Sequence, residues 1–388
     1  MSIAGRAIRK IPVARPFFGA EEERAIVAAL RSSWVSQGPR VVEFEQAFAR
    51  YVGASQAIAV SSCTTALHLA LIAAGVKQGD EVICPSLSFI ATANCIRYAG
   101  ATPVFADIDP VSYNMDPNRV EDAITPRTTA ILAVHQAGLP SPMKELAEIA
   151  RRKGLVLLED AACAIGSEYL GERIGHPHSL IACFSFHPRK IRSTGEGGMI
   201  TTNDESLAVR MRCLRQHAMN TSDLVRHSAS TVSIESYEEV GYNYRMTDLQ
   251  AAVGLEQLLR LDDMLAWRRK LASRYTRALA DLGWLLPPQE PAGCRHNFQS
   301  YMVRLATDAP LTRDQAMQSL LDLGVSTRRG IMAIHEETPY FDPIWEERLP
   351  ETERAAAETM ILPLFYTMTE EDQDYVIECL EQAGSSNS

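Results

Sequence analysis

Residues 184–201 read Phe-Ser-Phe-His-Pro-Arg-Lys-Ile-Arg-Ser-Thr-Gly-Glu-Gly-Gly-Met-Ile-Thr, and the rest of the sequence is interpreted around them. An apolar run over 180–186 ends at Pro188 and is followed by a lysine, Lys190. A glycine-rich turn then lets the backbone fold back into a second apolar run over 199–202. The pattern predicts one strand, a loop that presents Lys190, and another strand.

Lys190 has two interpretations. The first is an ordinary solvated lysine in a polar turn, which is the common situation for a lysine. The second is an amine in a partly desolvated pocket, where burial disfavours the ammonium form and the neutral amine can condense with an aldehyde. A partner carboxylate and a phosphate site elsewhere in the chain would favour the second interpretation.

Composition narrows the class of protein. A chain of 388 residues with 46% hydrophobic and 22% charged residues is typical of a soluble globular protein with two domains. No apolar run reaches the length of about 20 residues that a membrane helix needs, and no secretory signal follows the basic N-terminus. A net charge of −10 without a compensating basic stripe argues against a nucleic-acid partner.

The eight cysteines are scattered and contain no CxxC pair. Their spacing indicates neither a zinc site nor a disulfide framework, and we expect no metal in the functional site. This usage is typical of the reducing cytoplasm, which is the location that we expect.

Short apolar strands alternate with helices through the first 160 residues. Strands are expected at 57–60, 81–84, 102–106, 130–134 and 155–158, and helices at 21–31, 41–51, 66–74, 89–98 and 143–153. This alternation of strands and helices predicts an α/β layer on a mostly parallel sheet. Ligands bind at the carboxyl ends of the strands in such sheets.

The rest of the chain predicts a second, smaller domain. Helices are expected at 205–217, 260–282, 311–323 and 370–382, a strand at 300–305, a polar irregular loop at 219–239, and a polar turn at 328–330. We place a large domain at residues 1–255 and a smaller α+β domain at 256–388.

Two further stretches end predicted strands with polar groups. Ser61-Ser-Cys-Thr-Thr65 opens a helix, where free amides and hydroxyl groups can hold a phosphate, although a simple helix cap explains one of these hydroxyls. Asp160 follows the strand at 155–158, where it is either a functional carboxylate or the cap of a following turn.

Together these groups match one cofactor. A lysine amine could hold an aldehyde, an aspartate could keep a pyridinium nitrogen protonated, and a hydroxyl-lined helix start could hold a phosphate. These are the requirements of pyridoxal 5′-phosphate.

On its motifs the sequence resembles the sugar aminotransferases of the DegT/DnrJ/EryC1/StrS family. That family has the fold-type I architecture of pyridoxal-phosphate-dependent transferases, with a mostly parallel mixed sheet flanked by helices in the large domain. The matching stretches follow the family's order through nearly the whole chain: Gly53-Ala, Ile58-Ala-Val-Ser-Ser-Cys-Thr-Thr-Ala-Leu-His68, Gly79-Asp-Glu-Val-Ile83, Ser88-Phe-Ile-Ala-Thr92, Pro103-Val-Phe-Ala-Asp107, Val134-His-Gln-Ala-Gly138, Glu159-Asp-Ala-Ala162, Phe184-Ser-Phe-His-Pro-Arg-Lys190, Gly195-Glu-Gly-Gly198 and Gly241-Tyr-Asn-Tyr-Arg-Met246.

The resemblance implies roles for three residues around the cofactor ring. Lys190 would bond covalently to the cofactor and later move a proton as general acid and base. Asp160 would pair with the ring nitrogen, and Phe89 would stack on the ring.

For the cofactor phosphate, the resemblance implies contacts from Cys63, Thr64 and Ser185. It also implies that Asn243 reaches the phosphate of a neighbouring subunit, with Arg245 close by. A homodimer with shared active sites is therefore expected.

Cys163 departs from the family pattern. The family usually carries Gln or His at this position, where the side chain hydrogen-bonds near the phenolic oxygen of the cofactor. A thiol is a weak donor, so that contact is in doubt for Cys163. Related dehydratases carry His at the position of Lys190, so the lysine favours transamination.

The substrate implied by the resemblance is a nucleotide-linked keto-sugar, with glutamate as the usual amino donor, in amino-sugar biosynthesis for a polysaccharide or an antibiotic. His335 matches a position that faces the sugar nucleotide, and Arg328 and Arg329 either contact its diphosphate or form a solvated turn. Residues 134–140 and 329–332 resemble members that act at the 4-position of 4-keto-6-deoxy sugars. A sugar dehydratase and a non-catalytic sensor or regulator of the same family are the alternatives.

Overall fold

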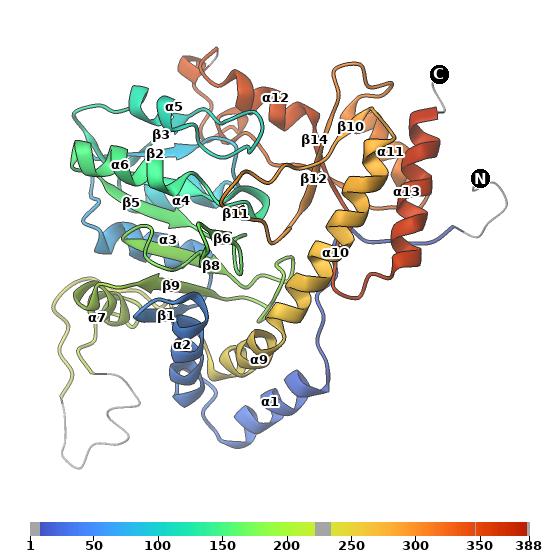
Figure 1. Ribbon diagram of the computed structural model, residues 1–388. Helices are drawn as coiled ribbons and strands as arrows, with labels where there is room; N and C mark the ends of the chain where they lie inside the picture. The colour runs from blue at the N-terminus through green and yellow to red at the C-terminus, as the bar shows by residue number, and fades with distance from the viewer. Residues whose placement is uncertain (1–7, 222–233, 346, 386–388) are drawn as a thin grey trace.

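A seven-stranded sheet forms the centre of the computed structural model, which describes residues 8–221, 234–345 and 347–385 (Figure 1). The strand order is β1-β9-β8-β5-β4-β2-β3. Within this sheet only β9 runs antiparallel to its neighbours, so the predicted mostly parallel sheet is confirmed. The strands are β1 (Gln56–Val60), β2 (Glu81–Pro85), β3 (Thr102–Ala106), β4 (Thr128–Val134), β5 (Val156–Asp160), β8 (Ile181–Ser185) and β9 (Gly198–Thr202).

Helices cover both faces of the sheet because successive strand residues point to opposite sides. Leu157 belongs to the apolar cluster on one face, and its neighbour Leu158 belongs to the cluster on the other. The first cluster includes residues of α2 (Pro39–Val52), α6 (Met143–Lys153), α9 (Asp248–Leu259) and the start of α10 (Leu261–Ala280), and the second includes residues of α3 (Cys63–Ala73), α4 (Ala91–Tyr98) and α7 (Glu205–Leu214).

Local signals set several helix boundaries. Helix α6 has the predicted bounds because Gly154 adopts a left-handed conformation with φ 66° directly after Lys153 and so ends the helix. Helix α3 begins three residues earlier than predicted because the hydroxyl of Ser62 accepts the amide of Thr65 and caps it.

The C-terminal part is built on a second, antiparallel sheet. Its four strands lie in the order β10-β12-β14-β13, and they surround a third apolar cluster with α10, α11 and α13. Helix α10 runs from the large sheet to this lobe (Figure 1). The elements are β10 (Leu285–Leu286), β12 (Tyr301–Leu305), α11 (Arg313–Asp322), β13 (Arg328–Arg329), α12 (Pro350–Glu358), β14 (Thr359–Leu362) and α13 (Glu370–Ser385).

The chain start also contacts this lobe. The amide of Ile11 donates to the carbonyl of Gly324 at 2.9 Å, and the amide of Leu364 donates to the carbonyl of Val13 at 3.2 Å. The domain boundary at residues 255 and 256 stays a prediction.

Three sequence-based expectations were wrong in detail. Arg328 and Arg329 form the edge strand β13, paired with Ile361 and Met360, rather than a polar turn. The helix expected at 260–282 begins after a break at Arg260, where φ is −100°. The helix expected at 205–217 ends at Leu214, and part of the loop expected at 219–239 lies outside the described residues.

The remaining elements are short or peripheral. Helix α1 (Ala20–Arg31) packs against α9, and α5 (Pro117–Asp122) packs against α6. Strands β6 (Glu168–Tyr169), β7 (Glu172–Arg173) and β11 (Cys294–Arg295) form a small third sheet.

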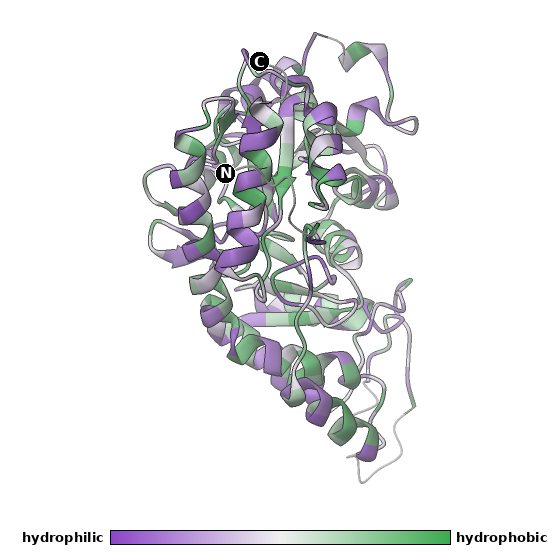
Figure 2. Cartoon of the chain, turned by 90° about the vertical axis from the view of Figure 1, so that its right-hand side faces the viewer, coloured by the Kyte–Doolittle hydropathy of each residue, from purple (hydrophilic) through white to green (hydrophobic). Residues whose placement is uncertain are grey.

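Many helical turns carry hydrophilic and hydrophobic residues side by side in Figure 2, whereas α3 is buried along most of its length. Among the described residues, no helix combines the length and the apolar character that crossing a membrane requires. All eight cysteines are free thiols.

Candidate active site

The predicted site residues gather where the parallel strands of the large sheet end. Asp160 is the last residue of β5, Ser185 is the last residue of β8, and Lys190 follows in the loop after β8. Cys63 begins α3, which follows β1. Because β9 runs the other way, its first residue, Gly198, also lies at this edge and pairs with Ser185.

Asp160 is a buried carboxylate with defined hydrogen bonds. The residue is only 6% exposed to solvent. Oδ2 accepts the hydroxyl of Thr92 at 2.8 Å, and Oδ1 accepts the amide of Ala162 at 3.1 Å. Burial raises the pKa of Asp160 above its ordinary value, and hydrogen bonds from Thr92 and Ala162 only partly oppose this effect.

Lys190 is half-buried, whereas the other five lysines are exposed to solvent. Its Nζ lies 3.1 Å from Sγ of Cys163. Burial lowers the pKa of Lys190, as the sequence led us to expect, but Cys163, Cys63 and Asp160 raise it more. The net pKa is therefore raised, and the expectation that burial alone would favour the neutral amine was wrong.

The start of α3 offers donors for an anion. Ser62 caps the helix, so the cap interpretation holds for this hydroxyl. The amides of Cys63 and Thr64 donate no hydrogen bond within the described residues, as is usual in the first turn of a helix. A Cβ on Gly198 would lie 2.5 Å from the carbonyl carbon of Ser62, so only glycine lets β9 approach this turn so closely.

Phe89 lies in the loop between β2 and α4, which leaves the same edge of the sheet. Its ring is 63% exposed, which is unusual for a phenylalanine. The carbonyl of Phe89 accepts the amide of Thr92, whose side chain bonds Asp160, so the backbone of Phe89 is held close to the buried carboxylate.

Several residues that orient Asp160 were missed as functional residues by the sequence analysis. Oγ of Ser88 lies 2.7 Å from Oγ1 of Thr92, which extends the hydrogen-bond chain to Asp160. The amide of His135 donates to the carbonyl of Asp160 at 3.2 Å. The four-residue spacing of Ser88 and Thr92 at the start of a helix was the available signal.

Hydrogen bonds at both ring nitrogens fix the orientation and the tautomer of His135. Its Nδ1 accepts the amide of Ser141 at 2.9 Å, so Nε2 carries the proton and donates to Oε2 of Glu159 at 2.8 Å. Both side chains are buried. This pair holds the end of β4 to the end of β5, next to Asp160.

A basic group lies beside Lys190. Burial lowers the pKa of Arg328, and the charges of Arg189 and Arg329 lower it further. Burial also lowers the pKa of His187, with further contributions from Arg189, Lys190 and Arg328. These effects require short separations, so the predicted residue Arg328 lies near the loop that carries Lys190.

His335 is buried against Ser86. Its Nδ1 lies 2.7 Å from Oγ of Ser86, and its Nε2 lies 3.4 Å from Oε1 of Glu353. Arg329 lies 3.5 Å from Glu337, in an exposed ion pair.

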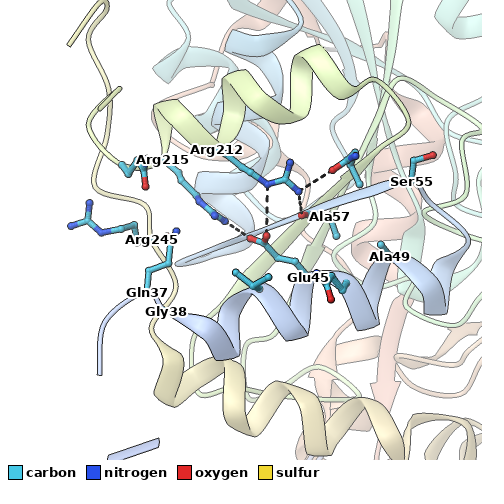
Figure 3. A pocket seen from close by; sticks show the side chains of 13 residues that line it. Gln37, Gly38, Glu45, Ala49, Ser55, Ala57, Arg212, Arg215 and Arg245 are labelled. Atoms are coloured by element: carbon cyan, nitrogen blue, oxygen red, sulfur yellow. Dashed lines mark hydrogen bonds and ion pairs between the residues drawn. The ribbon is translucent and has the colours of Figure 1, made fainter. Parts of the chain in front are cut away.

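Asn243 and Arg245 lie in a segment that runs beside the end of β1, where Arg245 pairs with Val60 and the carbonyl of Tyr244 accepts the amide of Ser61 at 2.9 Å. Arg245 lines a cavity of about 400 Å³ whose lining does not include Lys190 or Asp160. Figure 3 shows Arg245 apart from the cluster in which Arg212 and Arg215 pair with the buried Glu45. Asn243 is exposed. The backbone of both residues therefore lies near the start of α3, at the edge that carries the other predicted residues.

The fold and this site define a class. A mixed sheet that presents a lysine, a buried aspartate and a free helix N-terminus at one edge is the arrangement of a fold-type I pyridoxal-phosphate enzyme. The chain belongs to the DegT/DnrJ/EryC1/StrS aminotransferase family, whose sequence model matches residues 16–381.

Individual relatives agree with this assignment. The chain is 42% identical to GDP-perosamine synthase of Caulobacter vibrioides over 96% of this chain and 98% of the relative. It is 40% identical to the spore coat polysaccharide biosynthesis protein SpsC of Bacillus subtilis over 95% and 96%. The PLP form of Spr1654 from Streptococcus pneumoniae superposes with a TM-score of 0.91 at 26% identity, covering 98% of this chain and all of that chain.

The protein is therefore a pyridoxal-phosphate-dependent aminotransferase. When bound, this cofactor supplies a ring that accepts the electrons of a carbanion. The residues present fit it, because the edge offers an amine, a buried carboxylate for a cationic ring nitrogen, and unused amides for a phosphate.

The raised pKa of Asp160 predicts a stability effect with a definite sign. The folded cofactor-free protein binds this proton more tightly than the unfolded chain, so stability falls as pH rises from 3.8 to the folded pKa and stays reduced above it. Asp160→Asn should raise the free energy of unfolding of the cofactor-free protein by about 1 kcal/mol or more at pH 7. Urea unfolding at a series of pH values measures this difference, which should shrink as pH falls.

The exposed Asp308 provides the matched control, since Asp308→Asn should change little at any pH. An Asp160→Asn protein that is less stable than the wild type at pH 7 without cofactor would contradict the argument.

Proposed function

We propose that this aminotransferase moves an amino group from glutamate to a nucleotide-linked keto-sugar, at the 4-position of a 4-keto-6-deoxy sugar. The observation that carries the proposal is the shielded Lys190 beside a buried carboxylate, because the other five lysines are exposed. The name of the Caulobacter relative specifies an amino sugar linked to GDP, which favours GDP as the nucleotide.

Lys190 would bond to the cofactor and, once released by the amino donor, remove a proton at one carbon and return it at another. Asp160 would hold the cofactor's ring nitrogen in its protonated form, which its burial makes electrostatically effective. Phe89 would cover one face of the ring, and its exposed position supports this role. Cys163, at 3.1 Å from Nζ, would take the place of the Gln or His that is usual in the family.

The phosphate would be held by the amides of Cys63 and Thr64 and by the hydroxyl of Ser185. The resemblance implies that Asn243 and Arg245 contact the cofactor phosphate of a neighbouring subunit, and the exposure of Asn243 to solvent supports this role. We therefore infer a homodimer with shared active sites. A cytoplasmic location stays a prediction from cysteine usage.

The sugar nucleotide would approach from the basic side of the site. Its diphosphate carries two negative charges or more, and Arg328 lies near Arg189 and His187 in the part of the chain that surrounds Lys190. Arg329 would add to this field. His335 would face the sugar nucleotide from the position fixed by Ser86.

A panel of substrates tests the proposal. The purified protein is incubated with glutamate and with GDP-, dTDP- or UDP-linked 4-keto-6-deoxy sugars, and mass analysis follows the product. We expect one amino group to replace the keto oxygen, with 2-oxoglutarate formed in equal amount and GDP the best nucleotide.

Two results would contradict it. Loss of water from the sugar without consumption of glutamate would indicate a dehydratase. Binding of cofactor or sugar without turnover on any substrate would indicate a sensor or regulator.

The variant Arg328→Ala tests whether basic side chains bind the diphosphate of the sugar nucleotide. Loss of a charge-assisted contact to the diphosphate should raise KM for the nucleotide sugar about tenfold, equivalent to about 1.4 kcal/mol. The half-reaction with glutamate, which contains no diphosphate, should keep its rate. Stopped-flow absorbance measures the two half-reactions separately.

Arg277 on α10 is exposed and serves as the control, since Arg277→Ala should change neither half-reaction. An equal loss in both half-reactions of Arg328→Ala would mean that Arg328 supports the cofactor or the fold instead.

A further inference from the structure

A carboxylate and two imidazoles cluster between β7 and β8, outside the residues assigned to cofactor or substrate. Glu172 lies in β7, and His176 and His178 follow it in the loop that leads to β8. One ligand atom from each residue lies within 4.8 Å of the other two. Across the described residues, no second group of three or more His, Cys, Asp or Glu side chains has this spacing.

Two ring nitrogens in this cluster are buried and unsatisfied. Nδ1 of His176 and Nε2 of His178 are shielded from solvent and have no hydrogen-bond partner among the described residues. Nδ1 of His176 lies 2.9 Å from Oε2 of Glu172, yet the pair does not have hydrogen-bond geometry. Buried polar atoms are rarely left unpaired, so these two nitrogens need an explanation.

The orientation of the His176 imidazole supports an ion that is bound by several of these side chains. A ring nitrogen bonds in the plane of the ring, whether through a hydrogen or a lone pair. Since the in-plane direction of Nδ1 of His176 misses the nearby Glu172 oxygen, both atoms can face a common point beside them. An ion at that point would be within reach of both side chains.

The backbone holds both histidines in place. The amide of His178 donates to the carbonyl of His176 at 2.7 Å, and Pro177 between them fixes its own φ. Gly175 has φ +99°, and a Cβ there would lie 2.8 Å from the ring of Phe184. The loop is therefore positioned by the core, and little ordering is needed when an ion binds.

We propose that Glu172, His176 and His178 bind one divalent transition-metal ion, with Zn²⁺ as the best fit. Two imidazole nitrogens and one carboxylate oxygen suit zinc better than calcium or magnesium, which prefer oxygen ligands. Tetrahedral ligands at about 2.1 Å from zinc are separated by roughly 3.4 Å, which small side-chain movements can reach from the observed spacing. Water would complete the coordination.

The ion would link β7 to the segment that enters β8. Strand β8 ends at Ser185 and leads to Lys190, so the ion would stabilise the strand that carries the lysine loop. It would take no part in the chemistry, and this inference is independent of the proposed substrate.

Zinc binding by the cofactor-loaded protein without an affinity tag tests the proposal. After treatment with a chelator and dialysis, the protein is equilibrated with Zn²⁺, and bound zinc is measured by mass spectrometry alongside a calorimetric titration. We expect one zinc ion per chain and a melting temperature that rises with zinc concentration. His178→Gln and Glu172→Gln should each weaken binding at least about tenfold.

Matched variants separate the cluster from other zinc sites. His217→Asn removes an exposed histidine outside the cluster and should leave zinc affinity unchanged. Zinc held by the cofactor itself would persist in His178→Gln, and that outcome would overturn the proposal.

A plain ion pair between Glu172 and His176 predicts something different. In that case the variants would lower the melting temperature equally with and without zinc, and the wild type would bind no zinc. Either observation would refute the metal site even if one variant folds poorly.

Discussion

The structure depends on one electrostatic constraint, the burial of the Asp160 carboxylate at the end of β5. A buried charge is costly unless hydrogen bonds and an opposite charge compensate it. Thr92 and Ala162 provide the hydrogen bonds, but they leave the pKa of Asp160 raised. A cation close to the carboxylate would stabilise its ionised form further, and the protonated ring nitrogen of pyridoxal phosphate is such a cation. The bound cofactor would therefore offset part of the cost of burying Asp160.

Much of the large sheet could be predicted because its buried parallel strands are short apolar runs between clear helix signals. Other features depend on tertiary contacts. The edge strand β13 contains two charged arginines and pairs with β14 at Ile361 and Met360, and neither the pairing nor the strand has a local pattern. The direction of β9 is likewise set by the glycine-rich turn and not by the strand's own residues. Two-residue strands such as β6, β7 and β11 are too short to give any period.

The candidate site likewise contains some features that local sequence patterns predict and others that depend on tertiary contacts. The motifs placed Lys190, Asp160 and the start of α3 at one edge, as the structure has them, because chain order fixes where parallel strands end. The chain from Ser88 through Thr92 to Asp160 joins residues 68 positions apart, so its role was not visible locally. The electrostatics of Lys190 were misjudged because burial was considered without the Cys163 sulfur 3.1 Å away. Cys163 is the position at which the sequence analysis expected a departure from the usual Gln or His of the family.

The central claim is that Lys190 is the residue that bonds to the cofactor. Borohydride reduction of the cofactor-loaded protein, followed by peptide mass analysis, tests it most directly, because reduction fixes the cofactor permanently to the amine that holds it. The account predicts one labelled peptide, containing Lys190, and no label in Lys190→Ala. A label on any of the five exposed lysines at 10, 77, 144, 153 or 270, or no label at all, would contradict it.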